Sequence, residues 1–222
     1  MDQEAQNCLD WAREARTGIA EAVFAESKTP EQMLNIVRAT LDAGKCLFVT
    51  RLSVDVAAQI TRKYPEFFGY DADSRTGVIG QKPEHDKKSQ GIVIVAAGTS
   101  DMTVAKEAAE TLRFNGFQPK IIADVGVAGL WRLLERIDEI REARVVIAVA
   151  GMEGALFSVL GGLISAPVIA VPTSVGYGVS HNGKAALSSA LATCSPGIVT
   201  VNIDNGFGAA VACIKMLRAE HS

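Results

Sequence analysis

A short apolar run, a glycine-rich turn and a helical pattern recur in this order five times between residues 91 and 219. Several of the apolar runs consist almost wholly of Val, Ile and Ala, without the alternation of polar and apolar positions that marks a half-exposed strand. Parallel strands that are covered on both faces have this composition. We therefore predict five parallel strands, at residues 92–97, 120–123, 144–150, 167–171 and 198–203.

The stretches between and after these strands have the apolar periodicity of helices. Alternation of strand and helix at this spacing predicts right-handed βαβ units and a three-layer α/β fold, with an open, flavodoxin-like parallel sheet. The stretch 154–164 is apolar nearly all round, so we expect it to be buried, in part against another subunit. The predicted helices cover residues 102–115, 129–142, 154–164, 184–193 and 207–219.

The first 88 residues have a different pattern, with few of the chain's glycines. Thr29 and Pro30 predict the start of a helix, with Thr29 as the N-cap and Pro30 in the first turn. A polar run at 81–90 is typical of a linker. We predict a small α+β domain over 1–88 and an α/β domain over 89–222, the first containing helices at 3–16, 30–43 and 53–63 and strands at 22–25 and 47–50.

Composition and charge exclude several classes of protein. The chain has 222 residues, 48% of them apolar, and a net charge of −3 without a basic patch, which argues against nucleic-acid binding. The four cysteines form no C-x-x-C pair, so neither a disulfide scaffold nor a zinc site is expected, and reducing cytoplasm is the predicted location. Glycines and prolines interrupt the uncharged stretch 154–183, so we predict no membrane span.

Ligands of open parallel sheets bind outside the carboxyl ends of the strands. The first predicted turn there is Gly98-Thr99-Ser100-Asp101, where helix N-terminal amides and hydroxyls suit a phosphate or carboxylate. Ser100 or Asp101 as a plain helix cap explains the turn equally well. The second turn contains Asp124 and Gly126, at which a ligand can approach the backbone, although Asp124 also suits a solvated turn.

The third turn places Glu153 just after Gly151, at the start of an uncharged helix. Glu153 is a candidate general base, and stabilisation of the helix dipole is the equally weighted alternative. The fourth turn offers the hydroxyl groups and backbone amides around Ser174 and Tyr177. The turn after the fifth strand contributes Asn202, Asp204, Asn205 and Gly206, which either bind a ligand or cap the last helix.

Cys194 comes shortly before the fifth predicted strand. From its position alone it is a small packing residue, as are Cys8, Cys46 and Cys213.

Four motifs of the second domain resemble the LarB family. These proteins are pyridinium-3,5-biscarboxylic acid mononucleotide synthases of nickel-pincer nucleotide biosynthesis. Leu9-Asp10, Arg13 and Glu21 are similar to the N-terminal domain of that family, and the α/β domain is also similar to PurE-type carboxyaminoimidazole ribonucleotide mutases. The four motifs are DVGVAG (124–129), AVAGMEGAL (148–156), PVIAVPTSVGYG (167–178) and VNIDNGFGAA (201–210).

The resemblance implies a reaction. The pyridinium ring of nicotinic acid adenine dinucleotide is carboxylated by CO2 or bicarbonate, and the phosphoanhydride is hydrolysed to release AMP. In the family the nucleophile is the cysteine shortly before the last motif, which is Cys194 here, and Glu153 is the matching acid for removal of the ring proton. Ser100 and Asp101 match the PurE-type loop that holds carboxylate and phosphate, and Asp101 is expected to take part in catalysis.

The resemblance further implies a homo-oligomer, an octamer in PurE-type proteins. No tightly bound cofactor is expected; Mg²⁺ fits the hydrolytic step, although no ligand set for it can be recognised in the sequence. One position departs from the family pattern, because Trp131 stands where a His is usual before Arg132. Two alternatives therefore stay open: an aminoimidazole ribonucleotide carboxylase or mutase of purine biosynthesis, and a nucleotide-binding module without catalysis.

Overall fold

The computed structural model describes residues 8–81 and 91–219. The chain divides into two compact units, Met1–His85 and Asp86–Ser222. The predicted domain boundary at residue 88 and all of the predicted linker except Gln81 lie outside the described residues.

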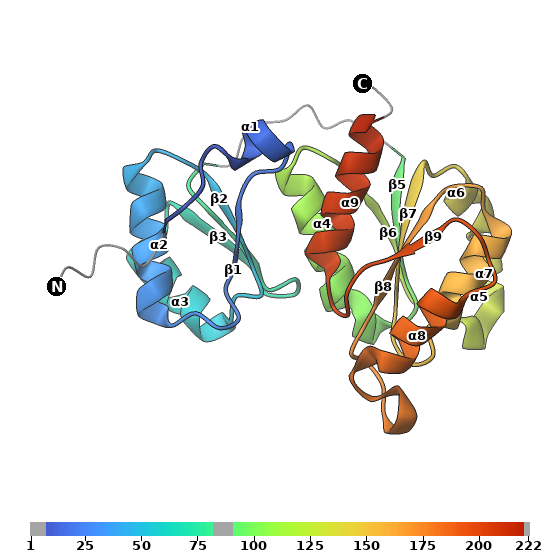
Figure 1. Cartoon of the computed structure of the whole chain (residues 1–222). Helices are drawn as coiled ribbons and strands as arrows, with labels where there is room; N and C mark the ends of the chain where they lie inside the picture. Colours follow the sequence, from blue (N-terminus) through green and yellow to red (C-terminus); the bar gives the residue numbers. More distant parts are fainter. Residues whose placement is uncertain (1–7, 82–90, 220–222) are drawn as a thin grey trace. The chain divides into compact units, whose positions relative to one another are not determined.

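The N-terminal unit is built on a four-stranded mixed sheet with the order β1-β2-β4-β3 (Figure 1). Strands β1 and β2 are parallel, and β4 is antiparallel to both β2 and β3. Met33 and Ile36 of α2 are buried in one core with Leu47 and Val49 of β2. The elements are α1 (Arg13–Thr17), β1 (Ala22–Phe24), α2 (Pro30–Asp42), β2 (Leu47–Thr50), α3 (Val54–Lys63), β3 (Phe68–Asp71) and β4 (Thr76–Ile79).

The start of α2 confirms the predicted cap. The Thr29 hydroxyl accepts a hydrogen bond from the Gln32 amide at 3.2 Å, and the Gln32 side chain accepts one from the Thr29 amide at 2.9 Å. This reciprocal pair satisfies two amides that the helix itself leaves free. Pro30 occupies the first helical position, where its missing N–H costs nothing.

The predicted helix over 3–16 is wrong for residues 8–12, which are not helical; residues 3–7 lie outside the described part of the chain. The Asp10 amide donates to the Glu21 carboxylate instead of entering a helix. The helix α1 begins only at Arg13, and it is capped after Thr17 by Gly18, which adopts the left-handed conformation with φ 76°.

The second unit contains a five-stranded, fully parallel sheet, as predicted, and the order of its strands is β6-β5-β7-β8-β9. Strands β5, β7 and β8 are buried along their whole length, in agreement with their unbroken Val, Ile and Ala runs. The strands are β5 (Ile92–Ala96), β6 (Lys120–Ile122), β7 (Val145–Ala150), β8 (Val168–Pro172) and β9 (Ile198–Thr200).

Helices cover both faces of this sheet (Figure 1). Helices α4 and α9 pack against each other on one face, and α5 to α8 lie on the other. None of the helices in the described stretches is both long and apolar enough to cross a membrane. The helices are α4 (Met102–Phe114), α5 (Leu130–Leu134), α6 (Ile137–Arg141), α7 (Ala155–Leu163), α8 (Lys184–Ala192) and α9 (Gly206–Ala219).

Two of the predicted helices differ from the structure in detail. The single helix predicted over 129–142 is broken into α5 and α6, yet Leu133, Ile137 and Ile140 are all buried. Because the apolar spacing continues across the break, the sequence pattern does not reveal it. Helix α7 buries Leu156, Phe157 and Leu160, whereas other positions such as Val159 are only half-buried.

A buried carboxylate joins α4 to α9. Glu107 is 4% exposed, and its Oε2 atom accepts a hydrogen bond from the Phe207 amide in the first turn of α9 at 3.2 Å. The free amides at a helix N-terminus need such partners, and the positive end of the helix dipole favours a negative charge there.

We expect Glu107→Ala to lower the free energy of unfolding by about 2–3 kcal/mol, since it removes this cap and leaves a cavity between the two helices. Chemical denaturation measures the change. Glu110→Ala is the matched control on the same helix, because Glu110 pairs with Arg113 near the surface, and it should cost about 0.5 kcal/mol or less. Equal losses for both variants would contradict the capping role of Glu107.

Candidate functional site

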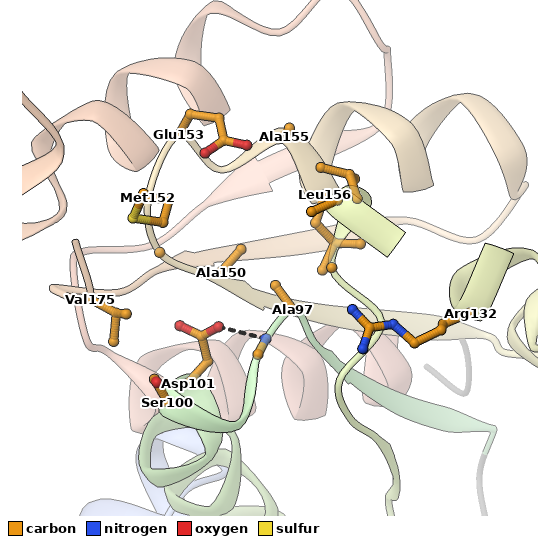
Figure 2. A pocket seen from close by; sticks show the side chains of 15 residues that line it. Ala97, Ser100, Asp101, Arg132, Ala150, Met152, Glu153, Ala155, Leu156 and Val175 are labelled. Carbon is orange, nitrogen blue, oxygen red and sulfur yellow. Dashed lines mark hydrogen bonds between the residues drawn. The ribbon is translucent and has the colours of Figure 1, made fainter. Parts of the chain in front are cut away.

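A cavity of about 360 Å³ lies at the carboxyl edge of the second sheet, among the turns that follow β5, β6, β7 and β8 (Figure 2). Strand β5 lies between β6 and β7, so the chain continues from β5 to one side of the sheet and then returns to the other side. An open α/β sheet binds ligands at such a switch point. The lining residues are Ala97, Gly98, Ser100, Asp101, Gly126, Val127, Ala128, Arg132, Ala150, Gly151, Met152, Glu153, Ala155, Leu156 and Val175.

Asp101 connects the turns on one side of this cavity. Its Oδ2 atom accepts from the Gly98 amide at 2.9 Å, and its Oδ1 atom accepts from the Thr173 hydroxyl at 2.6 Å. The Gly151 amide donates to the same carboxyl group. These donors follow β5, β8 and β7 respectively, so one side chain that is 3% exposed holds three strand ends together.

Burial raises the pKa of the Asp101 carboxyl above its ordinary value of 3.8, and this effect outweighs the three hydrogen bonds, which lower the pKa. Folding therefore shifts the balance of this carboxyl group toward its neutral form, relative to the unfolded chain. A raised carboxyl pKa contributes stability at low pH, and this contribution is lost as the pH rises through the pKa of the folded state.

We accordingly expect the stability of Asp101→Asn, relative to the unsubstituted chain, to improve as the pH rises from about 3 to about 7, because the amide cannot ionise. Denaturant unfolding at a series of pH values measures this difference. Any constant offset between the two proteins is irrelevant, since only the trend with pH is tested. A flat or opposite trend would show that the hydrogen bonds outweigh burial.

Arg132 places a positive charge at the opposite side of the cavity, as Figure 2 shows. Its Nη1 atom donates to Asp124 at 2.8 Å, which orients the guanidinium group. Its Nε–H is buried and has no acceptor among the described residues. A guanidinium with unused donors at the wall of a cavity is suited to a carboxylate or phosphate.

Glu153 reaches the cavity from a strained turn. Its neighbour Met152 has φ 52°, a left-handed conformation that costs a residue with a Cβ atom about 1 kcal/mol. The Met152 amide donates to the Val175 carbonyl at 2.7 Å, and this bond holds the turn after β7 against the turn after β8. Glu153 itself is exposed, as a group that exchanges protons with a ligand needs to be.

Two glycines allow these turns to approach one another closely. A Cβ atom at Gly126 would lie 2.9 Å from the Ala97 carbonyl oxygen, and one at Gly151 would overlap the Val175 carbonyl oxygen. Larger residues would therefore push the walls of the cavity apart.

The structure brings six of the predicted site residues to this cavity: Gly98, Ser100, Asp101, Gly126, Gly151 and Glu153. Asp124 contributes only through Arg132. The predicted residues Thr99, Ser174 and Tyr177 do not line it, and the Tyr177 side chain is 77% exposed.

The turn after β9 does not line the cavity either. Asn205 caps α9 by accepting from the Gly208 amide at 2.8 Å, which is the capping alternative stated for it above. Asp204 accepts from the Ser174 amide at 2.8 Å and thereby ties the turn after β9 to the turn after β8. Neither Asn202 nor Gly206 lies among the lining residues. Strand β9 is at the edge of the sheet, away from the switch point, which explains the separation.

Cys194 is exposed and lies in the turn between α8 and β9. That turn precedes β9, whereas the cavity lies beyond the carboxyl ends of the strands. Within one chain the structure therefore does not bring Cys194 to the cavity that contains Asp101 and Glu153.

Arg132 is the functional candidate that the sequence prediction missed. Arg132 lies inside a helix, whereas the site was predicted from residues that directly follow strands. The sequence hint of its ion pair was Asp124, eight residues earlier. Trp131, the departure from the family pattern, is 62% exposed and does not line the cavity. Its ring lies 6.0 Å from the Arg132 guanidinium carbon, so it packs beside the charge.

No group of three His, Cys, Asp or Glu side chains is arranged to hold a metal ion within residues 8–81 and 91–219. The carboxylates of the site act separately: Asp101 as an acceptor for three donors and Asp124 as the partner of Arg132.

Two family descriptions together match most of the chain. Residues 3–81 match the LarB/PurE-like N-terminal domain. Residues 91–222 match AIR carboxylase. An uncharacterized protein of Methanocaldococcus jannaschii is 37% identical over 210 residues, which cover 91% of this chain and 80% of that protein.

Solved structures with similarity to this chain include two from Treponema denticola. PurE is 22% identical, with a TM-score of 0.46, and the match covers 58% of this chain and 80% of that one. A substituted PurE2 is 20% identical, with a TM-score of 0.43, and the match covers 59% of this chain and 91% of that one.

Proposed function

Because the chain belongs to the AIR carboxylase family and carries the N-terminal domain of LarB-type proteins, we propose that it carboxylates the pyridinium ring of nicotinic acid adenine dinucleotide. In the same proposal the phosphoanhydride is hydrolysed, which gives pyridinium-3,5-biscarboxylic acid mononucleotide and AMP. The observation that carries the proposal is the joining of these two domains in one chain, since an AIR carboxylase domain alone would favour purine chemistry.

The proposed reaction has to overcome the poor nucleophilicity of a pyridinium ring. The Cys194 thiolate adds to a ring carbon, and the electron pair of the ring double bond neutralises the ring nitrogen. The electron-rich ring then attacks CO2 and forms a carbon–carbon bond. Glu153 removes the proton from the ring carbon that now carries the carboxylate. The thiolate then leaves with its electron pair, which restores the aromatic pyridinium. The net change is a ring hydrogen replaced by carboxylate, with release of one proton.

The walls of the cavity support this assignment by their charge. The substrate carries a carboxylate and a diphosphate, and the product gains a second carboxylate. Arg132 supplies donors for such an anion. Glu153, on another wall, is the one side chain of the cavity lining that is exposed and carries a carboxylate. Mg²⁺ in the hydrolytic step would be bound through the phosphate oxygens of the substrate.

We expect Arg132→Gln to raise the KM for the dinucleotide by about 10- to 100-fold, the loss of one charge-assisted interaction of about 1.5–3 kcal/mol. Steady-state kinetics with quantified AMP measure it. Arg136→Gln is the control, since Arg136 pairs with Glu139 and lies outside the cavity lining, and its KM should stay within about twofold. An unchanged KM for Arg132→Gln would remove Arg132 from substrate binding.

Mass analysis after incubation with nicotinic acid adenine dinucleotide and bicarbonate tests the proposal directly. We expect AMP together with a mononucleotide that is heavier than nicotinic acid mononucleotide by the mass of CO2. ¹³C-bicarbonate should label that product. Dinucleotide that is bound and recovered unchanged would favour the nucleotide-binding module instead.

The second candidate function is that of a carboxylase or mutase acting on an aminoimidazole ribonucleotide, which the AIR carboxylase match over residues 91–222 favours. This chemistry needs neither a cysteine nucleophile nor the N-terminal domain, because the aminoimidazole ring is already electron-rich. Incubation of the protein with the aminoimidazole ribonucleotide and bicarbonate distinguishes the two: turnover there, with none on the dinucleotide, would replace the leading proposal.

A further inference from the structure

Trp131 has no role in the proposed reaction, although it is the position at which this chain departs from the family pattern. Its large apolar side chain is exposed. On the same short helix, α5, the side chains of Leu130 and Leu134 are exposed as well. Trp131 therefore belongs to an apolar surface and is not an isolated residue, and such surfaces are typical of sites that bind another molecule.

The chain on both sides of Trp131 forms a wall of the cavity. Val127 and Ala128 line the cavity before it, and Arg132 lines the cavity directly after it. Trp131 is not a lining residue, so its indole stands beside the cavity and outside it. The centre of this ring lies 6.0 Å from the Arg132 guanidinium carbon. A ligand group that Arg132 holds thus has an exposed aromatic ring next to it.

The Arg132 guanidinium is held in an orientation that leaves a donor for a ligand. Its Nη1 atom donates to Asp124 at 2.8 Å, and its buried Nε–H has no acceptor among the described residues. A Cβ atom at position 129 would lie 2.8 Å from that Nε atom, so Gly129 allows the guanidinium to fold over the start of α5. A phosphate bound here would therefore have a fixed position relative to the Trp131 ring.

The size of the cavity indicates that part of a dinucleotide lies outside it. The cavity volume of about 360 Å³ is near the lower limit of the range for ligand pockets, about 300–1,000 Å³. The proposed substrate consists of two nucleosides joined by a diphosphate. If its nicotinate ring lies at Glu153 and its diphosphate at Arg132, on another wall, its adenosine extends past Arg132. The exposed aromatic side chain there is Trp131.

From these observations we propose that Trp131 stacks on the adenine base of the dinucleotide and thereby makes this chain prefer the dinucleotide to nicotinic acid mononucleotide. The inference rests on the proposed function, since it assigns one part of that substrate to a residue. Every nucleobase has a π-face that can stack on an indole. Because indole does not titrate, Trp131 contributes to binding and not to proton transfer.

Binding of AMP and of ribose 5-phosphate to the whole chain tests the assignment without turnover. Isothermal titration calorimetry should show that AMP binds about 5- to 100-fold more tightly, since only AMP carries the base. Trp131→Ala should lose this preference, because ribose 5-phosphate uses only the Arg132 contact. Trp131→Phe should restore most of it, because a phenyl ring also stacks.

Leu134→Ala is the matched control, since Leu134 is exposed on the same helix and lies outside the cavity lining, and it should keep the preference for AMP. A folding defect weakens the binding of both ligands alike, so it does not imitate the loss of a preference. If the unsubstituted protein showed no preference for AMP, or if Trp131→Ala retained it, the proposal would be overturned.

Fluorescence reports on the same contact in a chain that keeps Trp131. The chain has two tryptophans, and Trp11→Phe removes the one in the N-terminal unit. AMP should quench the remaining emission and saturate at the affinity that calorimetry gives. Emission that AMP leaves unchanged but that shifts on dilution would show that a second copy covers Trp131, and would contradict the proposal.

Kinetics separate this inference from the proposed function. Trp131→Ala should raise the KM for the dinucleotide by about 5- to 100-fold and leave kcat within about twofold. Carboxylated product formed with an unchanged KM would refute the role of Trp131 alone. A protein whose Trp131 binds AMP as expected, but which forms no carboxylated product, would refute the proposed function and leave the stacking contact in place.

Discussion

Replacing Cys194 with alanine should remove carboxylated product to below about one thousandth of the wild-type rate, while the protein stays folded and still binds the dinucleotide. Without the thiolate the pyridinium ring gains no electron pair, so it cannot attack CO2. Since Cys194 is exposed, its truncation should change the free energy of unfolding by about 0.5 kcal/mol or less. Loss of activity can then be attributed to chemistry and not to unfolding.

Two other cysteines provide controls for this variant. Cys8 is exposed and Cys46 is half-buried, both in the N-terminal unit, and their alanine variants should keep normal activity. A thiol-alkylating agent should inactivate the wild-type protein, and bound dinucleotide should slow this inactivation. A folded Cys194→Ala protein that still forms the carboxylated mononucleotide would exclude covalent catalysis by this residue.

Glu153→Gln should slow carboxylation by about 10²-fold or more, the scale expected for removal of a positioned general base. The amide retains the size of the side chain but cannot accept the ring proton. The KM for the dinucleotide should change little, in contrast to Arg132→Gln, because the proposed role of Glu153 concerns a step after binding. Product formation under saturating substrate measures the effect.

The alternative role of Glu153 is electrostatic stabilisation at the start of α7. On that account Glu153→Gln would lower the free energy of unfolding by about 0.3–1 kcal/mol and leave turnover nearly normal. Measurement of unfolding and turnover on the same preparation therefore separates the two roles.

The parallel sheet could be predicted because its strands are unbroken Val, Ile and Ala runs, which few other structures tolerate. The hairpin of β3 and β4 could not be predicted from the sequence. Gly69 and Gly77 lie within these strands, and glycine is unfavourable in strands in general. The structure shows the reason for Gly77, because a Cβ atom there would meet the Phe68 ring at 2.7 Å.

The candidate site was predictable to the extent that its residues directly follow strands. Gly98, Gly151 and Glu153 were recognised in this way and line the cavity. Arg132 was not, since the direction of a helical side chain depends on how the helix packs. The separation of Cys194 from the cavity follows from the same rule, because Cys194 precedes the fifth strand and the amino ends of parallel strands lie at the opposite edge of the sheet.

Side chains as well as backbone hydrogen bonds hold the carboxyl edge of the second sheet. The Gly98 amide is bound by Asp101, the Ser174 amide by Asp204 and the Phe207 amide by Glu107. Each of these amides depends for its hydrogen bond on one side chain and not on a strand pair. Hydrogen exchange should accordingly be faster along this edge than within β5, β7 and β8. The protein thus combines a rigid sheet with a rim that can adjust to a ligand of changing charge.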